Sequence, residues 1–218
     1  MPDTARPEYT NKVRVDISRP DPSVIQNAGK ILSNNGIVIF PAACLYGVAA
    51  NALSPKAVEK VFHIKQRPKD NPILVLIRDT DDLNTLVKSV PKAAQRLMDR
   101  FWPGSITLIF EAANHISPIL TAGTGKIGIR LPGHPIAQAL VHAVDFPITG
   151  TSANLSGKPG CIDPYRLPAS IVNEADLILD SGKVKGGIGS SIVDVTCNPI
   201  KIVREGAVSA NDINLALA

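Results

Sequence analysis

The sequence predicts an α/β protein with a mostly mixed sheet and flanking helices. In the first half of the chain, helical patterns alternate with continuous apolar runs, as they do where helices cover both faces of a sheet. In the second half, several short apolar runs follow one another without a helix between them, which indicates a mixed sheet. We expect one domain over residues 21–218, preceded by an irregular arm of residues 1–20.

The first two helices are delimited by the residues at their ends. A helix over residues 21–36 is expected to begin with Asp21 as its N-cap and to stop at Gly36 in the left-handed conformation. A second helix over residues 54–65 has Ser54 as its cap. A proline three residues beyond its end prevents the helix from continuing, because the residue before a proline avoids the helical conformation.

The other elements follow from the apolar runs and the remaining helical patterns. Strands are expected at residues 37–40, 73–77, 105–111, 127–131, 147–150, 177–180, 191–195 and 201–205. Helices are expected at residues 80–87, 91–100, 134–144, 164–173 and 209–218. Polar segments follow several strands, the first being a loop at residues 41–47. Ligands of open α/β sheets bind at such strand ends.

Composition limits the classes of function. The formal net charge is +4, with 19% charged residues, which is too weakly basic by itself to indicate nucleic-acid binding but suits an anionic small ligand. No apolar run is long enough to cross a membrane and the first residues contain no apolar signal sequence, so a cytoplasmic location is expected. The three cysteines form no CxxC pair and are expected to be reduced thiols, and no metal site is expected.

The segment "HIKQRPKDNPI" (63–73) places Lys65 and Arg67 in a turn between a helix end and a strand. A planar guanidinium beside a point charge suits a polyphosphate, because Arg binds it through two hydrogen bonds and Lys neutralises its charge. The structural alternative is a solvated helix end whose cations complement the helix dipole. The segment alone does not decide between them.

The segment "TGTSANLSG" (149–157) carries several hydroxyls and one amide directly after an apolar strand. Such a loop can surround phosphate or ribose oxygens, although an ordinary Ser/Asn turn has the same composition. "GTGKIG" (123–128) is not a phosphate-binding P-loop. Leu120 stands where the first glycine is required, and Ile127 follows Lys126 where Ser or Thr is required.

Taken together and in order, the motifs resemble those of the YrdC-like family, the threonylcarbamoyl-adenylate synthases. The family's K-x-R element is Lys65-Gln66-Arg67 and its S-x-N element is Ser152-Ala153-Asn154. Further landmarks are "RPKDNP", "FWPGSITLIF", "IGIRLPGHP", "SANLSGKP", "SSIVD" and "IVREGAVS". The likeness runs from about residue 22 to residue 210, so the chain is similar to the short, single-domain form.

The resemblance implies a twisted, mostly mixed open sheet with flanking helices, the YrdC-like (dihydroxybutanone-phosphate-synthase-like) fold. It also implies a nucleotidyltransferase that makes threonylcarbamoyl-adenylate and pyrophosphate from L-threonine, bicarbonate and ATP, for the modification of adenosine in tRNA. Positioning and charge neutralisation should dominate this chemistry. Mg²⁺ is expected to arrive with the nucleotide rather than in a protein cage.

The resemblance also assigns roles to residues. Lys65 and Arg67 are expected to be catalytic and partly exposed, in a turn that Pro68 and Pro72 stiffen. The expected nucleotide-binding residues are Arg67, Asn71, Lys126, Ser152, Asn154 and Arg204. The expected amino-acid-binding residues are Cys44, Tyr46, Arg130 and Ser190.

The sequence departs from the family pattern on the amino-acid side. The family loop P-T-E-T-x-Y-G is replaced here by "PAACLYG", with Ala42, Ala43 and Cys44 in the polar positions. Leu76 replaces a histidine and Ile162 a threonine. Because these positions have become less polar, the substrate could be threonine or a related amino acid.

Two other functions remain as alternatives. A non-catalytic or differently specific paralogue would bind nucleotide or double-stranded RNA in the same basic concavity, and tRNA is a further candidate partner. An enzyme acting on sugar phosphates would need a cluster of carboxylates, which the motifs do not contain.

Overall fold

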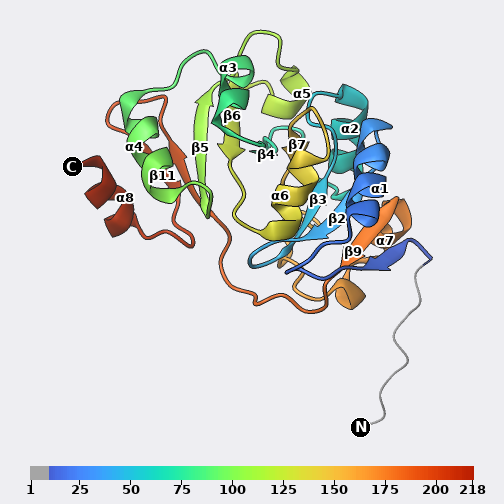
Figure 1. Ribbon diagram of the computed structural model, residues 1–218. Helices are drawn as coiled ribbons and strands as arrows, with labels where there is room; N and C mark the ends of the chain where they lie inside the picture. Colours follow the sequence, from blue (N-terminus) through green and yellow to red (C-terminus); the bar gives the residue numbers. More distant parts are fainter. Residues whose placement is uncertain (1–9) are drawn as a thin grey trace.

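The strands form two mixed sheets in the computed structural model, which describes residues 10–218. The five-stranded sheet has the order β1 (Lys12–Arg14), β9 (Leu177–Asp180), β2 (Val38–Pro41), β3 (Tyr46–Ala49) and β8 (Thr151–Ser152). The six-stranded sheet has the order β11 (Lys201–Arg204), β10 (Ser191–Asp194), β5 (Ile106–Glu111), β6 (Lys126–Arg130), β4 (Val75–Leu76) and β7 (Ile148–Thr149). Figure 1 shows the two groups of strands side by side.

Both sheets contain parallel and antiparallel pairs, which confirms the predicted mixed α/β class. Strand β2 is parallel to β9 and antiparallel to β3, and β6 is parallel to β4 and antiparallel to β5. The division into two sheets was not predicted. It falls at Gly150, between β7 and β8, where a Cβ would lie only 2.6 Å from Cγ of Leu76.

Helices lie along the sheets and at both ends of the molecule (Figure 1). Helices α1 (Pro22–Ser33) and α6 (Pro135–His142) pack together so closely that a Cβ at Gly29 would lie 2.9 Å from the carbonyl oxygen of Ala143. Four further helices are α2 (Pro55–Ile64), α3 (Leu83–Leu86), α5 (Pro118–Thr121) and α7 (Ala169–Glu174), and there are 3₁₀ turns η1 (Thr80–Asp82) and η2 (Pro164–Arg166).

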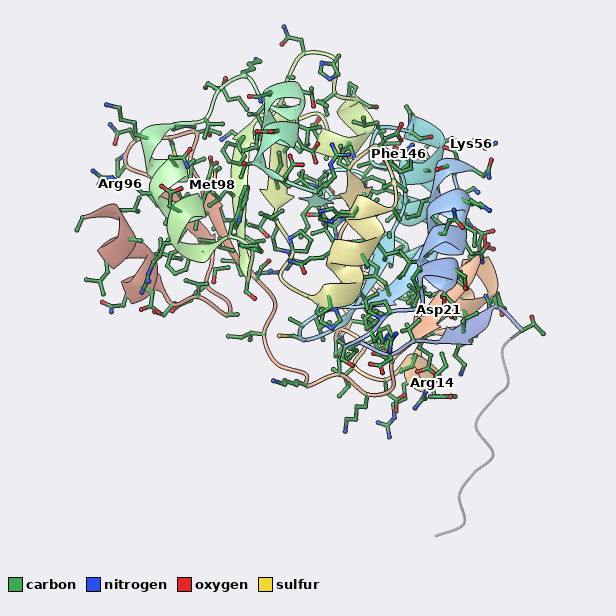
Figure 2. All side chains as sticks on the ribbon, in the orientation of Figure 1. Arg14, Asp21, Lys56, Arg96, Met98 and Phe146 are labelled. Atoms are coloured by element: carbon green, nitrogen blue, oxygen red, sulfur yellow. The ribbon has the colours of Figure 1, made fainter. Side chains whose placement is uncertain are left out.

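Helices α4 (Lys92–Phe101) and α8 (Ala210–Leu217) pack on each other at one end of the molecule. Figure 2 shows Arg96 and Met98 on α4, and the Arg96 guanidinium donates a hydrogen bond of 2.5 Å to the carbonyl oxygen of Leu217. Met98 is buried in the larger of two hydrophobic clusters, while α1 and α6 bury the smaller one. No helix within residues 10–218 is long and apolar enough to cross a membrane.

The predicted helix starts are confirmed by their hydrogen bonds. Asp21 accepts from the backbone N–H of Ser23 at 2.8 Å, and Ser54 accepts from that of Ala57. The predicted left-handed stop at Gly36 is wrong, because Asn35 has the positive φ, of 60°. Gly36 instead allows the side chain of Ile31 to pack closely against its backbone.

Four short elements, β1, β3, β8 and α5, were not predicted from the sequence. Residues 12–14, expected to be irregular, form β1 and pair in parallel with β9. Residues 41–47 are not simply a loop: β2 extends to Pro41 and β3 begins at Tyr46, so the segment is a tight antiparallel hairpin. Strand β8 and helix α5 are only two and four residues long, too short for any periodicity to appear. Residues 1–9 of the expected arm lie outside the described residues.

Candidate nucleotide and anion site

Lys65 joins the two main motifs. It follows the last turn of α2, and its side chain is buried, with the whole residue 1% exposed. Its ammonium donates hydrogen bonds to the carbonyl oxygens of Ser152 and Asn154, the second at 2.8 Å. Its own carbonyl oxygen accepts from the N–H of Ser156 at 2.9 Å. The structure thus brings K-x-R and S-x-N together, but the expectation that Lys65 is partly exposed is wrong.

Burial changes the acidity of Lys65. Removal from water, the larger cause, and the nearby charge of Arg67 both disfavour the ammonium form and together lower its pKa to about 8. The two carbonyl oxygens favour the charged form and hold the ammonium in place. Lys65 therefore carries a proton at neutral pH that it can lose more easily than an exposed lysine.

Arg67 lies in the turn after α2, directly beyond Gln66, whose φ is 47°. Its Nε donates to the carbonyl oxygen of Asn71 at 3.0 Å and its Nη2 to that of Pro72 at 2.8 Å. These bonds orient the half-buried guanidinium and leave other N–H groups for a ligand. Burial lowers the pKa of Arg67. Asn71 is exposed, and its backbone rather than its side chain shapes the turn.

Asn154 organises the S-x-N loop. Its side-chain N–H groups donate to the carbonyl oxygens of Leu155 and Lys158, both at 2.7 Å, and its side-chain oxygen accepts from the Ser152 hydroxyl. Both donors of the amide are used within the loop. The structural alternative of a hydrogen-bonded turn therefore describes this loop well, and the loop is tied to α2 through Lys65.

Arg130 and Arg204 approach each other at the end of the six-stranded sheet. Burial, the largest cause, and the nearby charge of Arg204 lower the pKa of Arg130 to about 10. The Nε of Arg130 is buried without a hydrogen-bond partner, while Arg204 donates to the carbonyl oxygen of Ser190 at 2.6 Å through Nη2. No ion pair within residues 10–218 involves either arginine.

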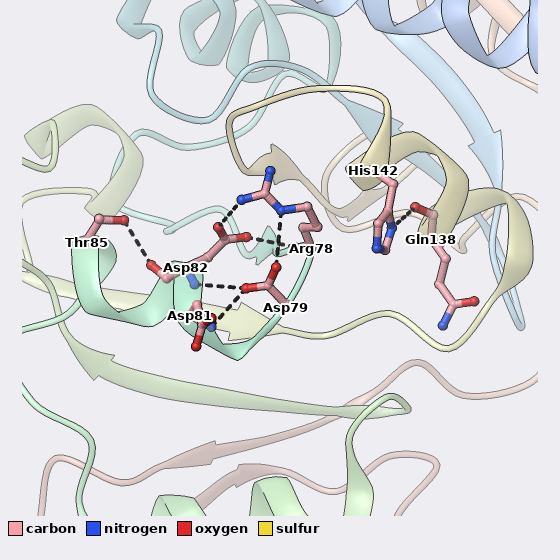
Figure 3. Close-up of polar contacts among 7 residues, drawn as sticks. All are labelled: Arg78, Asp79, Asp81, Asp82, Thr85, Gln138 and His142. Atoms are coloured by element: carbon pink, nitrogen blue, oxygen red, sulfur yellow. Dashed lines mark hydrogen bonds and ion pairs between the residues drawn. The ribbon is translucent and has the colours of Figure 1, made fainter.

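Arg78 provides a contrast, because acidic side chains of the same chain neutralise its charge. It pairs with Asp79 at 3.2 Å and Asp82 at 3.1 Å, just beyond β4 (Figure 3). Arg130 and Arg204 lack such acids, although bringing two cations together without counter-ions is costly. Their arrangement indicates a site for an anionic ligand.

The expected amino-acid-binding residues have different environments. Tyr46 is buried, and its hydroxyl donates to the carbonyl oxygen of Gly182 at 2.7 Å and accepts from the N–H of Ser181. Burial raises its pKa to about 12. The Ser190 hydroxyl shares a 2.9 Å hydrogen bond with Thr107. Tyr46 is thereby committed to the fold.

Cys44 lies in the hairpin turn between β2 and β3 and is half-buried. A Cβ at Gly187 would lie 3.8 Å from its sulfur, and this sulfur is close enough to Arg130 that its negative charge, in the thiolate form, raises the pKa of that guanidinium. All three cysteines, Cys44, Cys161 and Cys197, are free, as predicted. Cys44 thus stands beside the anion site.

Two residues lie apart from this group. Lys126 begins β6, at the opposite end of the strand from Arg130, and pairs with Asp194 at 2.8 Å. Leu76 is fully buried in the smaller hydrophobic cluster, beneath α6. Leucine at this position therefore contributes to the core.

Two cavities border the motifs. One of about 270 Å³ lies behind the S-x-N loop, and the other, of about 700 Å³, lies beside the outer face of α2 and includes Arg67. Lys158 and Arg166 line the first cavity and were not predicted as site residues. In the sequence, only their positive charges could have indicated these two residues, and such charges occur throughout the chain. Within residues 10–218, no three His, Cys, Asp or Glu side chains are grouped to hold a metal ion.

Comparison with known proteins decides the family. A family model described as telomere recombination, for the Sua5, YciO and YrdC proteins, matches residues 30–206. The chain belongs to the Sua5/YciO/YrdC family. It is 36% identical to threonylcarbamoyl-AMP synthase of Bacillus subtilis over 93% of this chain, and 33% identical to that of Pyrococcus abyssi over 87%.

The Sua5/YciO/YrdC fold is also found in solved structures. Sua5 of P. abyssi, in a crystal structure with L-threonine, has a TM-score of 0.88 and 31% identity over 95% of this chain. YciO of E. coli has a TM-score of 0.80 and 28% identity, over 90% of this chain and 94% of its own. The expected YrdC-like fold is therefore confirmed.

The relatives differ in length from this chain. It spans 58% of the B. subtilis protein and 56% of the P. abyssi protein, but 86% of a putative threonylcarbamoyl-AMP synthase of Methanocaldococcus jannaschii, to which it is 34% identical.

Proposed function

We propose that this protein uses ATP, bicarbonate and L-threonine or a closely related amino acid to form an aminoacyl-carbamoyl adenylate for tRNA adenosine modification. The pair of arginines without acidic partners, Arg130 and Arg204, supports this proposal most directly. The family membership supplies the reaction class, because several relatives are named threonylcarbamoyl-AMP synthases.

The reaction brings several negative charges together. The amine of the amino acid and bicarbonate give a carbamate and water, and a carbamate oxygen then attacks the α-phosphorus of ATP. The bond from that phosphorus to the bridging oxygen breaks, and pyrophosphate leaves. Carboxylate, carbamate and triphosphate repel one another, so fixed cations are the main requirement.

The geometry suggests a division of labour among the cations. Arg130 would bind the carboxylate of the amino acid, and Arg204 and Arg67 would bind phosphate oxygens through their remaining N–H groups. Lys65 would act by holding the S-x-N loop beside the nucleotide. Mg²⁺ would arrive with ATP, because substrate phosphates usually supply several of its ligands.

Pyrophosphate release tests this proposal. The intact protein is incubated with ATP, Mg²⁺, bicarbonate and each of the twenty amino acids in turn. We expect release that requires bicarbonate and is fastest with threonine or another β-branched amino acid. Arg130→Ala should raise the KM for the amino acid and Arg204→Ala that for ATP. Absence of release with all twenty amino acids would contradict the proposal.

Contact with RNA is a second candidate function. Four exposed cations lie on two neighbouring segments, which are joined by a 2.9 Å hydrogen bond from the N–H of Val184 to the carbonyl oxygen of Ile162. These cations are Lys158, Arg166, Lys183 and Lys185. We expect tRNA or double-stranded RNA to bind weakly here, with an affinity that falls steeply as salt rises. Fluorescence anisotropy over a salt series measures this, and salt-independent binding would argue against a phosphate contact.

A further inference from the structure

Residues 181–190, the connecting segment, join the two sheets without forming a helix or a strand. In Figure 1 the orange chain runs along the edge of the molecule between β9 and β10. The segment is held at Val184, through the hydrogen bond to Ile162. It is held again at Gly189, whose carbonyl oxygen accepts from the N–H of Ala207 at 2.9 Å, and at Ser190, through Thr107 and Arg204. Between these attachments lie the four residues 185–188.

Two of those four residues are glycines, and a third, Gly189, follows Ile188. Gly186 and Gly187 have φ values of 75° and 114°, which a side chain would strain. A Cβ at Gly189 would lie 3.2 Å from Nη2 of Arg204. The glycines therefore permit both the present path of the chain and a change in that path, while the attachments at the two ends stay in place.

Ile188 is the only large side chain between the two closest approaches of this segment to the anion site. Gly187 on one side lies beside Cys44, and Gly189 on the other lies beside Arg204. Ile188 itself is 65% exposed. Single exposed apolar residues are common. Ile188 differs because glycines flank it on both sides and because its segment passes the candidate anion site, where Arg130 and Arg204 have no acidic partners among the described residues.

We propose that Ile188 closes over the bound amino acid, covering its apolar side chain and excluding water from the carbamate. This inference rests on the proposed function and adds a substrate-contacting residue to it. A carbamate that takes a proton breaks its C–N bond and returns amine and CO₂. A site that holds a carbamate until it reacts with ATP therefore benefits from the exclusion of water. An apolar cover also favours an amino acid with a branched apolar surface.

Because Ile188 is exposed, it can be mutated with little effect on the fold. Ile188→Ser and Ile188→Ala should leave the thermal midpoint almost unchanged, because little native packing is lost. The matched control is Val203→Ser: Val203 is 51% exposed and precedes Arg204 on β11, so its side chain points to the other face of the strand.

Kinetics of pyrophosphate release give the first measurement. Ile188→Ser should raise the KM for threonine about tenfold, the effect of losing much of one buried isoleucine contact, and should leave the KM for ATP unchanged. Val203→Ser should match the wild type. Equal behaviour of Ile188→Ser and Val203→Ser would overturn the assignment.

Hydrogen exchange gives a second measurement that does not need turnover. With threonine, bicarbonate and a non-hydrolysable ATP analogue, the amides of residues 185–189 should exchange more slowly, and trypsin should cut less after Lys185. Unchanged exchange and cleavage would show that the segment does not close, as expected if Ile188 contacts a macromolecule instead. Pyrophosphate release by the wild type with no effect at Ile188 would reject this inference and leave the proposed function standing.

Discussion

Lys65 shows how one residue can have a different task from the one its motif implies. Its position in K-x-R predicts a ligand for phosphate, yet its ammonium donates hydrogen bonds to two backbone carbonyl oxygens of the S-x-N loop. The sequence predicted that Lys65 is important but did not predict its role. The burial of Lys65 depends on the S-x-N loop, which packs over it and lies far along the chain.

Replacing Lys65 should therefore reduce stability. Lys65→Met keeps the aliphatic stem but removes both hydrogen bonds of the ammonium, which should cost about 2 kcal/mol of unfolding free energy. The carbonyl oxygen of Asn154 loses its side-chain donor, while that of Ser152 still accepts from the backbone N–H of Asn154. Arg67→Ala, as the comparison, should cost less stability and weaken ATP binding more. Urea denaturation and calorimetric titration with ATP measure the two effects. If Lys65→Met is as stable as the wild type, the carbonyl contacts do not support the loop.

The lowered pKa of Lys65 predicts a pH dependence of stability. Its pKa is about 8 in the folded protein, against an ordinary value of 10.5 for lysine, so between these two pH values the unfolded chain binds more protons. Stability should consequently rise with pH, by roughly 2 kcal/mol for this residue between about pH 7.5 and 9.5. Unfolding should be measured below pH 10, because Tyr46, with its raised pKa, acts in the opposite direction above it. Lys65→Met should lack this rise; an identical rise in the mutant would assign it to other groups.

At the scale of elements, the site depends on short turns between secondary-structure elements. The S-x-N loop follows the two-residue strand β8 and is closed by Asn154. The hairpin turn between β2 and β3 carries Cys44 to the anion site. Each turn is too short for periodicity, so sequence located the motifs without giving their conformations.

Asn154→Ala should destabilise the S-x-N loop. It removes three side-chain hydrogen bonds, which should lower the unfolding free energy by roughly 1–3 kcal/mol. ATP affinity should fall less than in Arg204→Ala, because the Asn154 donors are already used. Thermal melts with and without ATP separate the effects. A mutant with normal stability and lost affinity would instead make Asn154 a direct ligand.

The hairpin turn predicts altered amino-acid selectivity. Ala42, Ala43 and Cys44 offer no hydroxyl or amide to the hydroxyl of threonine, and an unpaired buried hydroxyl costs roughly 1–3 kcal/mol. Threonine should therefore bind about tenfold to a hundredfold more weakly than in family members that have the polar loop, and valine should compete well with it. Cys44→Thr should shift the preference towards threonine. Competitive titration measures this; exclusion of valine by the wild type would mean that backbone groups recognise the hydroxyl.

For the molecule as a whole, sequence predicted the class of fold and most of the longer elements. Helix caps at Asp21 and Ser54 and the runs of apolar residues are local signals, and they were read correctly. The division into two sheets and the meeting of Arg130 with Arg204 depend on contacts between distant segments, for which a single sequence holds no local signal. Lys126 was assigned to the nucleotide by resemblance, and only the structure shows its ion pair with Asp194.

The pairing of β9 has a consequence for how the protein is made. Ile178 of β9 lies opposite both Lys12 of β1 and Ile39 of β2, so a late segment completes a sheet that begins near the start of the chain. On the ribosome, β1 and β2 emerge long before their common partner and must wait for it with unpaired edges. Such long-range pairing slows folding and exposes strands to other chains in the meantime. Tyr46, whose hydroxyl contacts Ser181 and Gly182 directly after β9, can take its final place only then. The hairpin that carries Cys44 to the candidate site is thus among the last parts of the protein to reach its final structure.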